Sequence, residues 1–266
     1  MSELFILDNG EHIHLDEFGP SGAESITLVA LHGLGGAGYL FAGIGQFPGI
    51  RALCPDLPGN GLSPRPKQPI TFDYFADTIV QLIQRKTTGR IALLGHSMGA
   101  IIALKVYAAL PDRIGSLIFV GGLPAPLPQA QSRLRERAAL IRATGLASVT
   151  PTIIPVLFAE RSFNTIPDNV AMFTRLLAQS DAEGYAQTAE ALADASAADV
   201  VPRVRIPCLC VTGTEDRYAP PAAVRAFADS IQGAVYREIP NCGHMPFYET
   251  PDEFNGMIRS FLAEVK

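Results

Sequence analysis

The pentapeptide Gly95-His96-Ser97-Met98-Gly99 is the segment that most constrains how this chain of 266 residues can fold. It follows the apolar run 91–94 directly and precedes the helix-prone run 100–104. A sharp strand-to-helix turn that presents a serine hydroxyl needs small neighbours, and the two glycines supply them. The segment predicts a nucleophile elbow. Ser97 would stand at its tip, with the N–H of Met98 beside it at a helix N-terminus, where it can stabilise an oxyanion.

An elbow of this kind predicts an acid and then a histidine further along the chain. Asp216 follows the strand-like run 208–211, and His244 follows the strand-like run 234–239. The order serine, acid, histidine predicts a catalytic triad of Ser97, Asp216 and His244. Glu215 adjoins Asp216 and is the alternative acid, although Asp216 sits deeper in the turn before Pro220.

The four other histidines are weaker candidates for the base. His12 and His14 alternate along an N-terminal strand pattern, which favours its solvent face. His96 is the variable residue of the elbow, and His32 lies far upstream of the serine. Only His244 follows both the serine and the acid, in a loop from which an imidazole can reach Ser97.

A second oxyanion donor should come from the loop that follows the strand-like run from Ser25 to Leu31. This loop reads His32-Gly33-Leu34-Gly35-Gly36, and its three glycines let the backbone turn back over the serine. The N–H of Leu34 is therefore the expected second donor, although a plain flexible loop is the alternative. His32 and Gly33, at the start of the loop, are expected to border the substrate.

Composition favours a globular enzyme and disfavours several other classes. The hydrophobic content of 48% is enough for a sizeable core, and the length fits one domain with an insertion. A net charge of −5 without a basic tract makes nucleic acid and anionic membranes poor partners. No apolar run approaches the roughly 20 residues that span a bilayer.

The N-terminal region is acidic and lacks the pattern of a secretory signal. The four cysteines lie in buried-looking positions without zinc-site spacing: Cys54, Cys208, Cys210 and Cys242. They are interpreted as reduced thiols of a cytoplasmic protein. We expect a small-molecule substrate, no metal and no organic cofactor, and a homo-oligomer is compatible with the sequence.

Strands and helices alternate along most of the chain, which is typical of a mostly parallel sheet covered on both faces. The first two strands flank Asn9-Gly10, a tight hairpin signal, and should be antiparallel. Eight strands are expected at 4–7, 12–17, 28–31, 51–54, 91–94, 117–120, 208–211 and 235–239. Helices are expected at 72–85, 98–110, 221–231 and 252–265. The helix after the elbow is apolar nearly all round and should be buried against the sheet.

The stretch from Leu123 to Pro202 breaks this alternation. It opens with three prolines and continues with helical patterns such as 133–141 and 183–192. A helical insertion between two strands of the sheet predicts a cap over their carboxyl ends, where a ligand would bind. The expected division is a core formed by 1–123 and 203–266, and a helical cap over 124–202.

Taken together, the motifs His32 to Gly36, Asp56 to Ser63, Gly95 to Gly99, Gly213 to Pro220 and Gly243-His244 resemble the cap-bearing α/β-hydrolases over the whole chain. The resemblance implies an α/β-hydrolase fold with an eight-stranded, mostly parallel sheet. Because a serine occupies the nucleophile position, it also implies ester, lactone, thioester or related acyl chemistry.

The last part of the insertion, 176–192, is similar to that of 3-oxoadipate enol-lactonases, as are Ser97 to Gly99 and the segment 109–114. This sub-family usually has a second glycine where Ala100 stands here. If the substrate is a small carboxylated lactone, a cation should meet its carboxylate. Arg133, Arg137 and Arg161 are candidates, together with Arg135, Arg142 and Arg175, although a solvated helix face is the favoured role for most of them.

The expected mechanism has Ser97 attacking an acyl carbon, His244 moving the proton and Asp216 orienting the imidazole. Carbon–carbon bond hydrolases and general carboxylesterases share most of these motifs and stay open as alternatives. A slow ligand receptor and a cofactor-free oxygenase are further alternatives, because fold does not determine function.

Overall fold

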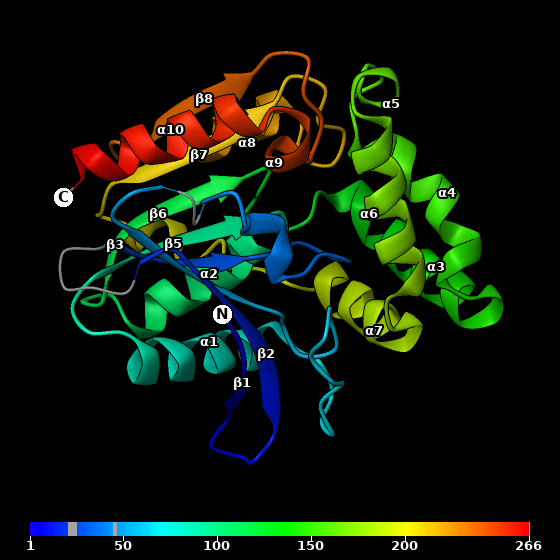
Figure 1. Cartoon of the computed structure of the whole chain (residues 1–266), viewed down its shortest axis with the longest axis horizontal. Coiled ribbons are helices and arrows are strands. Elements are labelled where there is room, and N and C mark those ends of the chain that lie inside the picture. The colour runs from blue at the N-terminus through cyan, green and yellow to red at the C-terminus, as the bar shows by residue number, and fades with distance from the viewer. Residues whose placement is uncertain (21–25, 45–46, 266) are drawn as a thin grey trace.

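The computed structural model describes residues 1–20, 26–44 and 47–265. The strands within these residues form one eight-stranded sheet in the order β1-β2-β4-β3-β5-β6-β7-β8. The strands are β1 (Ser2–Ile6), β2 (His12–Phe18), β3 (Ile26–Leu31), β4 (Ile50–Pro55), β5 (Ile91–His96), β6 (Ile114–Val120), β7 (Cys208–Gly213) and β8 (Val235–Ile239). Figure 1 shows the sheet in the left half of the view, between layers of helices.

The strand pairing confirms the expected mixed sheet. β1 pairs antiparallel with β2 across the turn at Asn9 and Gly10, and β2 pairs antiparallel with β4. All pairs from β4 to β8 are parallel. Ser25, the first residue of the strand-like run before the glycine-rich loop, lies outside the described residues. His12 and His14 lie on the less buried face of β2, as expected. His14 is nevertheless largely covered, because its ring contacts the Asp56 carboxylate at 3.1 Å and its side chain is 11% exposed.

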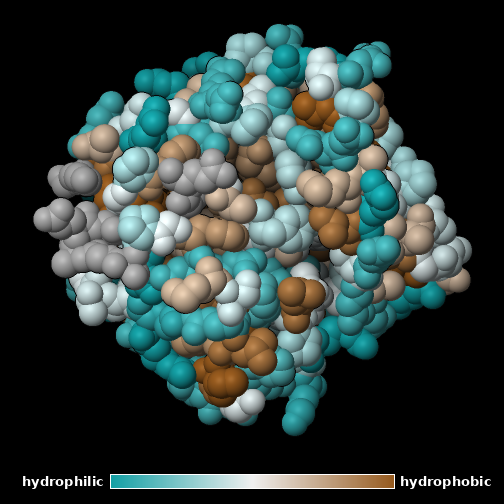
Figure 2. All heavy atoms as spheres, viewed as in Figure 1, coloured by the Kyte–Doolittle hydropathy of each residue, from teal (hydrophilic) through white to brown (hydrophobic). Residues whose placement is uncertain are grey.

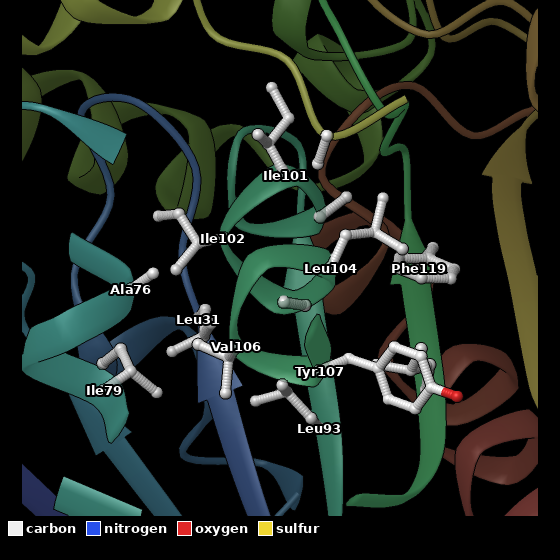
Figure 3. Packing of buried hydrophobic residues seen from close by; sticks show 14 of the residues in the cluster. Leu31, Ala76, Ile79, Leu93, Ile101, Ile102, Leu104, Val106, Tyr107 and Phe119 are labelled. Carbon is white, nitrogen blue, oxygen red and sulfur yellow. The ribbon is translucent and has the colours of Figure 1, made fainter. Parts of the chain in front are cut away.

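Four helices cover the two faces of the sheet: α1 (Phe72–Lys86), α2 (Gly99–Ala109), α8 (Pro221–Asp229) and α10 (Pro251–Glu264). The first three share one apolar cluster with alternate strand residues such as Leu93, whereas α10 packs with the opposite set, such as Leu94. The expected burial of the helix after the elbow is confirmed. Figure 3 shows Ile102 and Leu104 of α2 among Leu31 of β3 and other core residues.

Five α-helices lie between β6 and β7 in the chain: α3 (Pro128–Thr144), α4 (Leu146–Leu157), α5 (Ser162–Thr165), α6 (Pro167–Gln179) and α7 (Ala182–Ala193). Figure 1 shows them grouped on the right, beyond one end of the sheet strands. Their apolar side chains, such as Leu157 and Phe173, belong to the same cluster as α10 and one sheet face. These helices therefore extend the core rather than forming a separate one.

Three short elements were not expected from the sequence: η1 (Gly38–Phe41), η3 (Val201–Arg203) and α9 (Pro246–Glu249). The last follows His244 directly. In the view of Figure 2, hydrophilic residues cover most of the surface, with smaller hydrophobic areas between them. Within the described residues, the model contains no helix with the length and apolarity needed to span a bilayer.

Candidate active site

Ser97 lies in the strained turn that the elbow pattern predicts. Its φ of 54° is in the left-handed region, which is uncommon for a residue with a side chain. The turn is tight: a Cβ on Gly95 would lie 2.3 Å from the Gly99 carbonyl oxygen, and a Cβ on Gly99 would lie 2.5 Å from that of Leu31. The N–H of Ser97 donates to the Val120 carbonyl at 2.9 Å, which ties the turn to β6. The strain leaves the hydroxyl at the carboxyl end of the sheet.

The glycine-rich loop after β3 passes directly beside the serine. A Cβ on Gly33 would lie 2.8 Å from the Ser97 Cβ, so only glycine permits this approach. Within the described part of the chain, the N–H groups of Leu34 and Met98 donate to no protein acceptor. Met98 caps the N-terminus of α2, and Leu34 borders the cavity beside Ser97. Two N–H donors are thus free for a ligand oxygen near the serine.

Asp216 and His244 form a buried hydrogen-bonded pair. The Nδ1 of His244 lies 2.7 Å from Asp216 Oδ2, and the two residues are each 3% exposed. The other carboxylate oxygen accepts the N–H groups of Tyr218 and Ala219 at 2.9 and 2.8 Å, which fixes its orientation. Glu215 instead accepts the N–H of Glu160 at 3.4 Å. The structure therefore brings Asp216, and not Glu215, to the histidine.

Ser97 and His244 line the same cavity. The Ser97 hydroxyl makes no hydrogen bond to any described residue, so it is available to a ligand. Hydrogen bonds between catalytic groups often tighten only when substrate is bound. The ring of His96 lies 4.8 Å from that of His244, and its Nε2 donates to the His244 carbonyl at 2.9 Å. Burial lowers the pKa of His96 well below its ordinary range, so this ring stays neutral.

Two adjoining cavities meet at Ser97. The larger has a volume of about 230 Å³ and is lined by the elbow, by α3 and by the loop after Asp216. The smaller, of about 60 Å³, is lined by the glycine-rich loop, His96 and His244. Together they would hold a small molecule rather than a long acyl chain. Of the described residues, no aspartate or glutamate lines either cavity, whereas Arg133, Arg137 and Arg217 do.

Arg137 is the cation best placed for a ligand. It lines both cavities and is half-buried, and its guanidinium nitrogens donate to the hydroxyls of Tyr185 and Tyr218 at 3.4 and 3.3 Å. In the described ranges, no carboxylate lies within ion-pair distance of it. Guanidinium groups match carboxylates in a bidentate geometry, so this uncompensated charge favours an anionic ligand.

The other expected arginines point elsewhere. Arg135 pairs with Asp194, Arg142 pairs with Glu183 and Glu190, and Arg161 is exposed and lines neither cavity. Arg175 donates to the Ala171 carbonyl on its own helix. Only Arg133 and Arg137 of the expected set reach the cavities.

His32 also lies away from the cavities. It is fully buried, its Nδ1 lies 2.8 Å from the Gly33 carbonyl, and its Nε2 accepts the Leu57 N–H at 3.0 Å. Burial lowers the pKa of His32, and both nitrogens are occupied. The ring holds the glycine-rich loop in place and has no group free for a substrate. All four cysteines are buried, and the described residues contain no group of side chains suited to hold a metal.

Sequence reasoning did not find Tyr185, Tyr218 or Glu249. The first two contact Arg137, and Glu249 accepts the N–H groups of Gly243 and Met245 on either side of His244. Tyr218 lies two residues after Asp216, so its proximity to the acid was the one available signal. Only the tertiary packing of α7 and α9 brings Tyr185 to the cavity and Glu249 to the loop that carries His244.

The chain belongs to the alpha/beta hydrolase family, whose model matches residues 28–257. It is 27% identical over 210 residues to 3-oxoadipate enol-lactonase 2 of Acinetobacter baylyi, covering 79% of this chain and 78% of that protein.

Two solved structures are similar over nearly their whole length. A malate-bound thermophilic esterase from Thermogutta terrifontis has a TM-score of 0.89 and 26% identity, covering 100% of this chain and 99% of that one. The enol-lactonase from Burkholderia xenovorans has a TM-score of 0.87 and 25% identity, covering 96% and 98%. The protein is thus an α/β-hydrolase that resembles enol-lactonases and esterases.

Proposed function

We propose that the protein is a serine hydrolase that cleaves a small ester or lactone through an acyl-enzyme. One observation carries this proposal: a strained Ser97 shares a cavity with the buried His244–Asp216 pair. The free N–H groups of Leu34 and Met98 add the oxyanion site that acyl transfer needs. Residues of this chain then position the nucleophile, transfer its proton and stabilise the charge of the oxyanion.

In the first half of the reaction, Ser97 Oγ forms a bond to the acyl carbon while His244 Nε2 takes its proton. Asp216 holds the Nδ1–H of the imidazole and stabilises its positive charge. The N–H groups of Leu34 and Met98 hold the tetrahedral oxyanion. The carbon–oxygen bond to the leaving group then breaks, and His244 returns the proton to that oxygen.

In the second half, water attacks the acyl-enzyme with His244 as general base, and the ester bond to Ser97 breaks. The acid product leaves with Ser97 protonated again. A lactone substrate keeps its leaving hydroxyl on the same molecule, so one ring-opened acid is released.

The substrate is proposed to carry a carboxylate. Arg137 lies in the cavity wall without a carboxylate partner in the described structure, and Arg133 and Arg217 add positive charge. The similarity to an enol-lactonase, and to an esterase whose structure has malate bound, supports an acidic ligand. We propose that Arg137, held between Tyr185 and Tyr218, binds this group.

Residues 124–202, which contain the helices between β6 and β7, are proposed to form a cap that selects the substrate. α3 contributes Arg133, Leu134 and Arg137 to the cavity walls, and α7 contributes Tyr185 and Leu192. A cap that encloses the serine limits the length of the acyl group and excludes bulk water.

A turnover screen tests this proposal. It would compare lactones and nitrophenyl esters, with and without a carboxylate, and vinylogous diketones as substrates for carbon–carbon hydrolysis. We expect ester or lactone cleavage that is lost in Ser97→Ala. Exclusive turnover of diketones would assign carbon–carbon bond hydrolysis instead. Ligand binding without turnover would indicate a receptor, and oxygen consumption with an aromatic heterocycle would indicate an oxygenase.

A further inference from the structure

The Glu249 carboxylate is buried without a cation. It closes the short helix α9, is 8% exposed, and has no lysine, arginine or histidine within ion-pair distance in the described residues. A buried carboxylate costs free energy unless hydrogen bonds compensate it. Glu249 takes these bonds from two different parts of the molecule.

One oxygen of Glu249 binds the loop that carries the histidine. Oε1 accepts the N–H of Gly243 at 3.0 Å and the N–H of Met245 at 3.1 Å, so His244 lies between the two anchored peptides. The thiol of Cys242 also lies 3.8 Å from this oxygen. Burial first, and then the negative charge of Glu249, raise the pKa of that thiol.

The other oxygen binds the insertion. Oε2 accepts the N–H of Ala159, between α4 and α5, at 2.8 Å and the hydroxyl of Ser162, the first residue of α5, at 2.7 Å. The N–H of His244 itself donates to the carbonyl of Leu157, the last residue of α4, at 2.7 Å. One carboxylate therefore bridges the histidine loop and the helices over the site.

The remaining polar group of the His244 backbone is also fixed, because its carbonyl accepts the Nε2–H of His96. The histidine is thus held from the elbow on one side and from the insertion and α9 on the other. A misplacement of about 1 Å in such a group can cost on the order of 100-fold in rate, even when its cause lies away from the reacting atoms.

We propose that Glu249 is a positioning residue that acts through Gly243 and Met245 to hold His244 in register with Ser97, and that couples this register to the insertion through Ala159 and Ser162. The proposal rests on the proposed function for its kinetic readout. Glu249 does not contact the substrate in this proposal, so the affinity for substrate should be unaffected by its substitution.

The first test compares Glu249→Gln with the wild type. Gln keeps the shape but replaces one acceptor oxygen with an NH₂ group that faces N–H or O–H donors. We expect kcat per folded molecule to fall by about 10- to 100-fold with KM changed less than about threefold. A purely structural role would lower only the thermal midpoint and leave kcat unchanged after correction for folded protein, which would overturn the proposal.

A spectroscopic readout separates this proposal from the proposed function. The proton between His244 Nδ1 and Asp216 should give a downfield proton resonance, and Glu249→Gln should shift or broaden it. An unchanged resonance contradicts the coupling. This measurement stays informative if the wild type hydrolyses none of the esters tested, an outcome that would overturn the proposed function alone.

Ser162→Ala provides a milder variant if Glu249→Gln does not fold. It removes one of the two hydrogen bonds that the insertion donates to the carboxylate. We expect kcat to fall about two- to fivefold, with the same resonance perturbed. Ser148→Ala is the matched control, because Ser148 is an exposed serine on α4 that bonds only nearby residues. Equal kcat for Ser162→Ala and Ser148→Ala would show that the insertion does not act on His244.

Discussion

The sheet and the insertion contribute to the site in different ways. At the ends of the strands, the backbone sets the geometry: the φ of Ser97, the close approach of Gly33, and the free N–H groups of Leu34 and Met98. In the insertion, side chains set the geometry of the site, mainly those of Arg137 and Tyr185. We infer that the chemistry is encoded in short local segments, and that substrate choice is encoded in how α3 and α7 pack over them.

Three of the arginines of α3 show that neighbours on one helix can have different surroundings. Arg133 and Arg137 are four residues apart and lie on one helix face, toward the cavity. Arg135 lies between them in the chain and points to Asp194. The difference between these neighbours provides matched pairs of variants for the insertion, whereas Asp216 and Glu215 provide such a pair for the sheet.

Loss of the hydroxyl at the elbow should have the largest effect. Ser97→Ala removes the nucleophile but keeps the turn, so we expect turnover to fall on the order of 10⁴-fold or more. Steady-state kinetics on a nitrophenyl ester, with circular dichroism to verify folding, measures this loss. Retention of more than about a tenth of wild-type turnover would remove the nucleophile role from Ser97.

The acid should come next. Asp216→Asn should reduce turnover roughly 10³- to 10⁴-fold, because the amide favours the wrong tautomer of His244. Glu215→Gln, the matched neighbour, should cost little. Paired kinetics of the two variants decides the assignment, and the opposite ranking would transfer the role to Glu215.

In the insertion, Arg137→Met should act on substrate charge. We expect KM for a carboxylated ester to rise about 10- to 100-fold, while KM for the corresponding neutral ester changes little. The control Arg135→Met removes a similar charge from the outer face of α3 and should leave both values near the wild type. An equal loss for both esters would mean that Arg137 supports the fold and not the ligand.

The enclosed cavities should also limit acyl length. Across nitrophenyl esters from acetate to palmitate, kcat/KM should fall roughly tenfold or more once the acyl chain exceeds the cavity. The same assay on all esters, below their aggregation limits, gives the profile. A rise toward long chains would indicate a lipase-like lid in place of a closed cap.

The smallest effect concerns the dependence of stability on pH, which buried histidines should cause. It belongs to the sheet region, because residues 124–202 contain no histidine. His96 and His32 have folded-state pKa values below the ordinary 6.5, so the unfolded chain binds these protons first. The contribution of each neutral ring to the free energy of unfolding should therefore be fully present above pH 6.5. Below this pH it should decline by at most about 1.4 kcal/mol per pH unit for each ring. Urea unfolding at pH 7, 6 and 5 should show a shallower decline in His96→Gln, and identical slopes would contradict this account.

Much of the sheet could be predicted from the sequence because its signals are local. All eight expected strands are present, and the boundaries differ by a few residues, as at β6, which begins at Ile114 rather than Leu117. The elbow, the hairpin at Asn9 and the glycine-rich loop follow from backbone requirements that few residues meet.

The rest depends on tertiary packing. The sequence could not show which arginines face the cavities, because helical periodicity does not say which side of α3 meets the core. It also suggested a substrate contact for His32, whose ring is occupied by Gly33 and Leu57. The role of Glu249 requires α9, the histidine loop and the insertion to meet in space.

Active-site labelling tests the central claim, a serine nucleophile activated by His244 and Asp216, most directly. The protein would be treated with a fluorophosphonate, and intact-mass spectrometry with peptide mapping would follow the adduct while ester turnover is measured in parallel. We predict one adduct per chain, on the peptide that contains Ser97, with turnover lost in proportion to labelling and no adduct in Ser97→Ala. Full ester turnover with Ser97 unlabelled, or inactivation through a label on another residue, would contradict the claim.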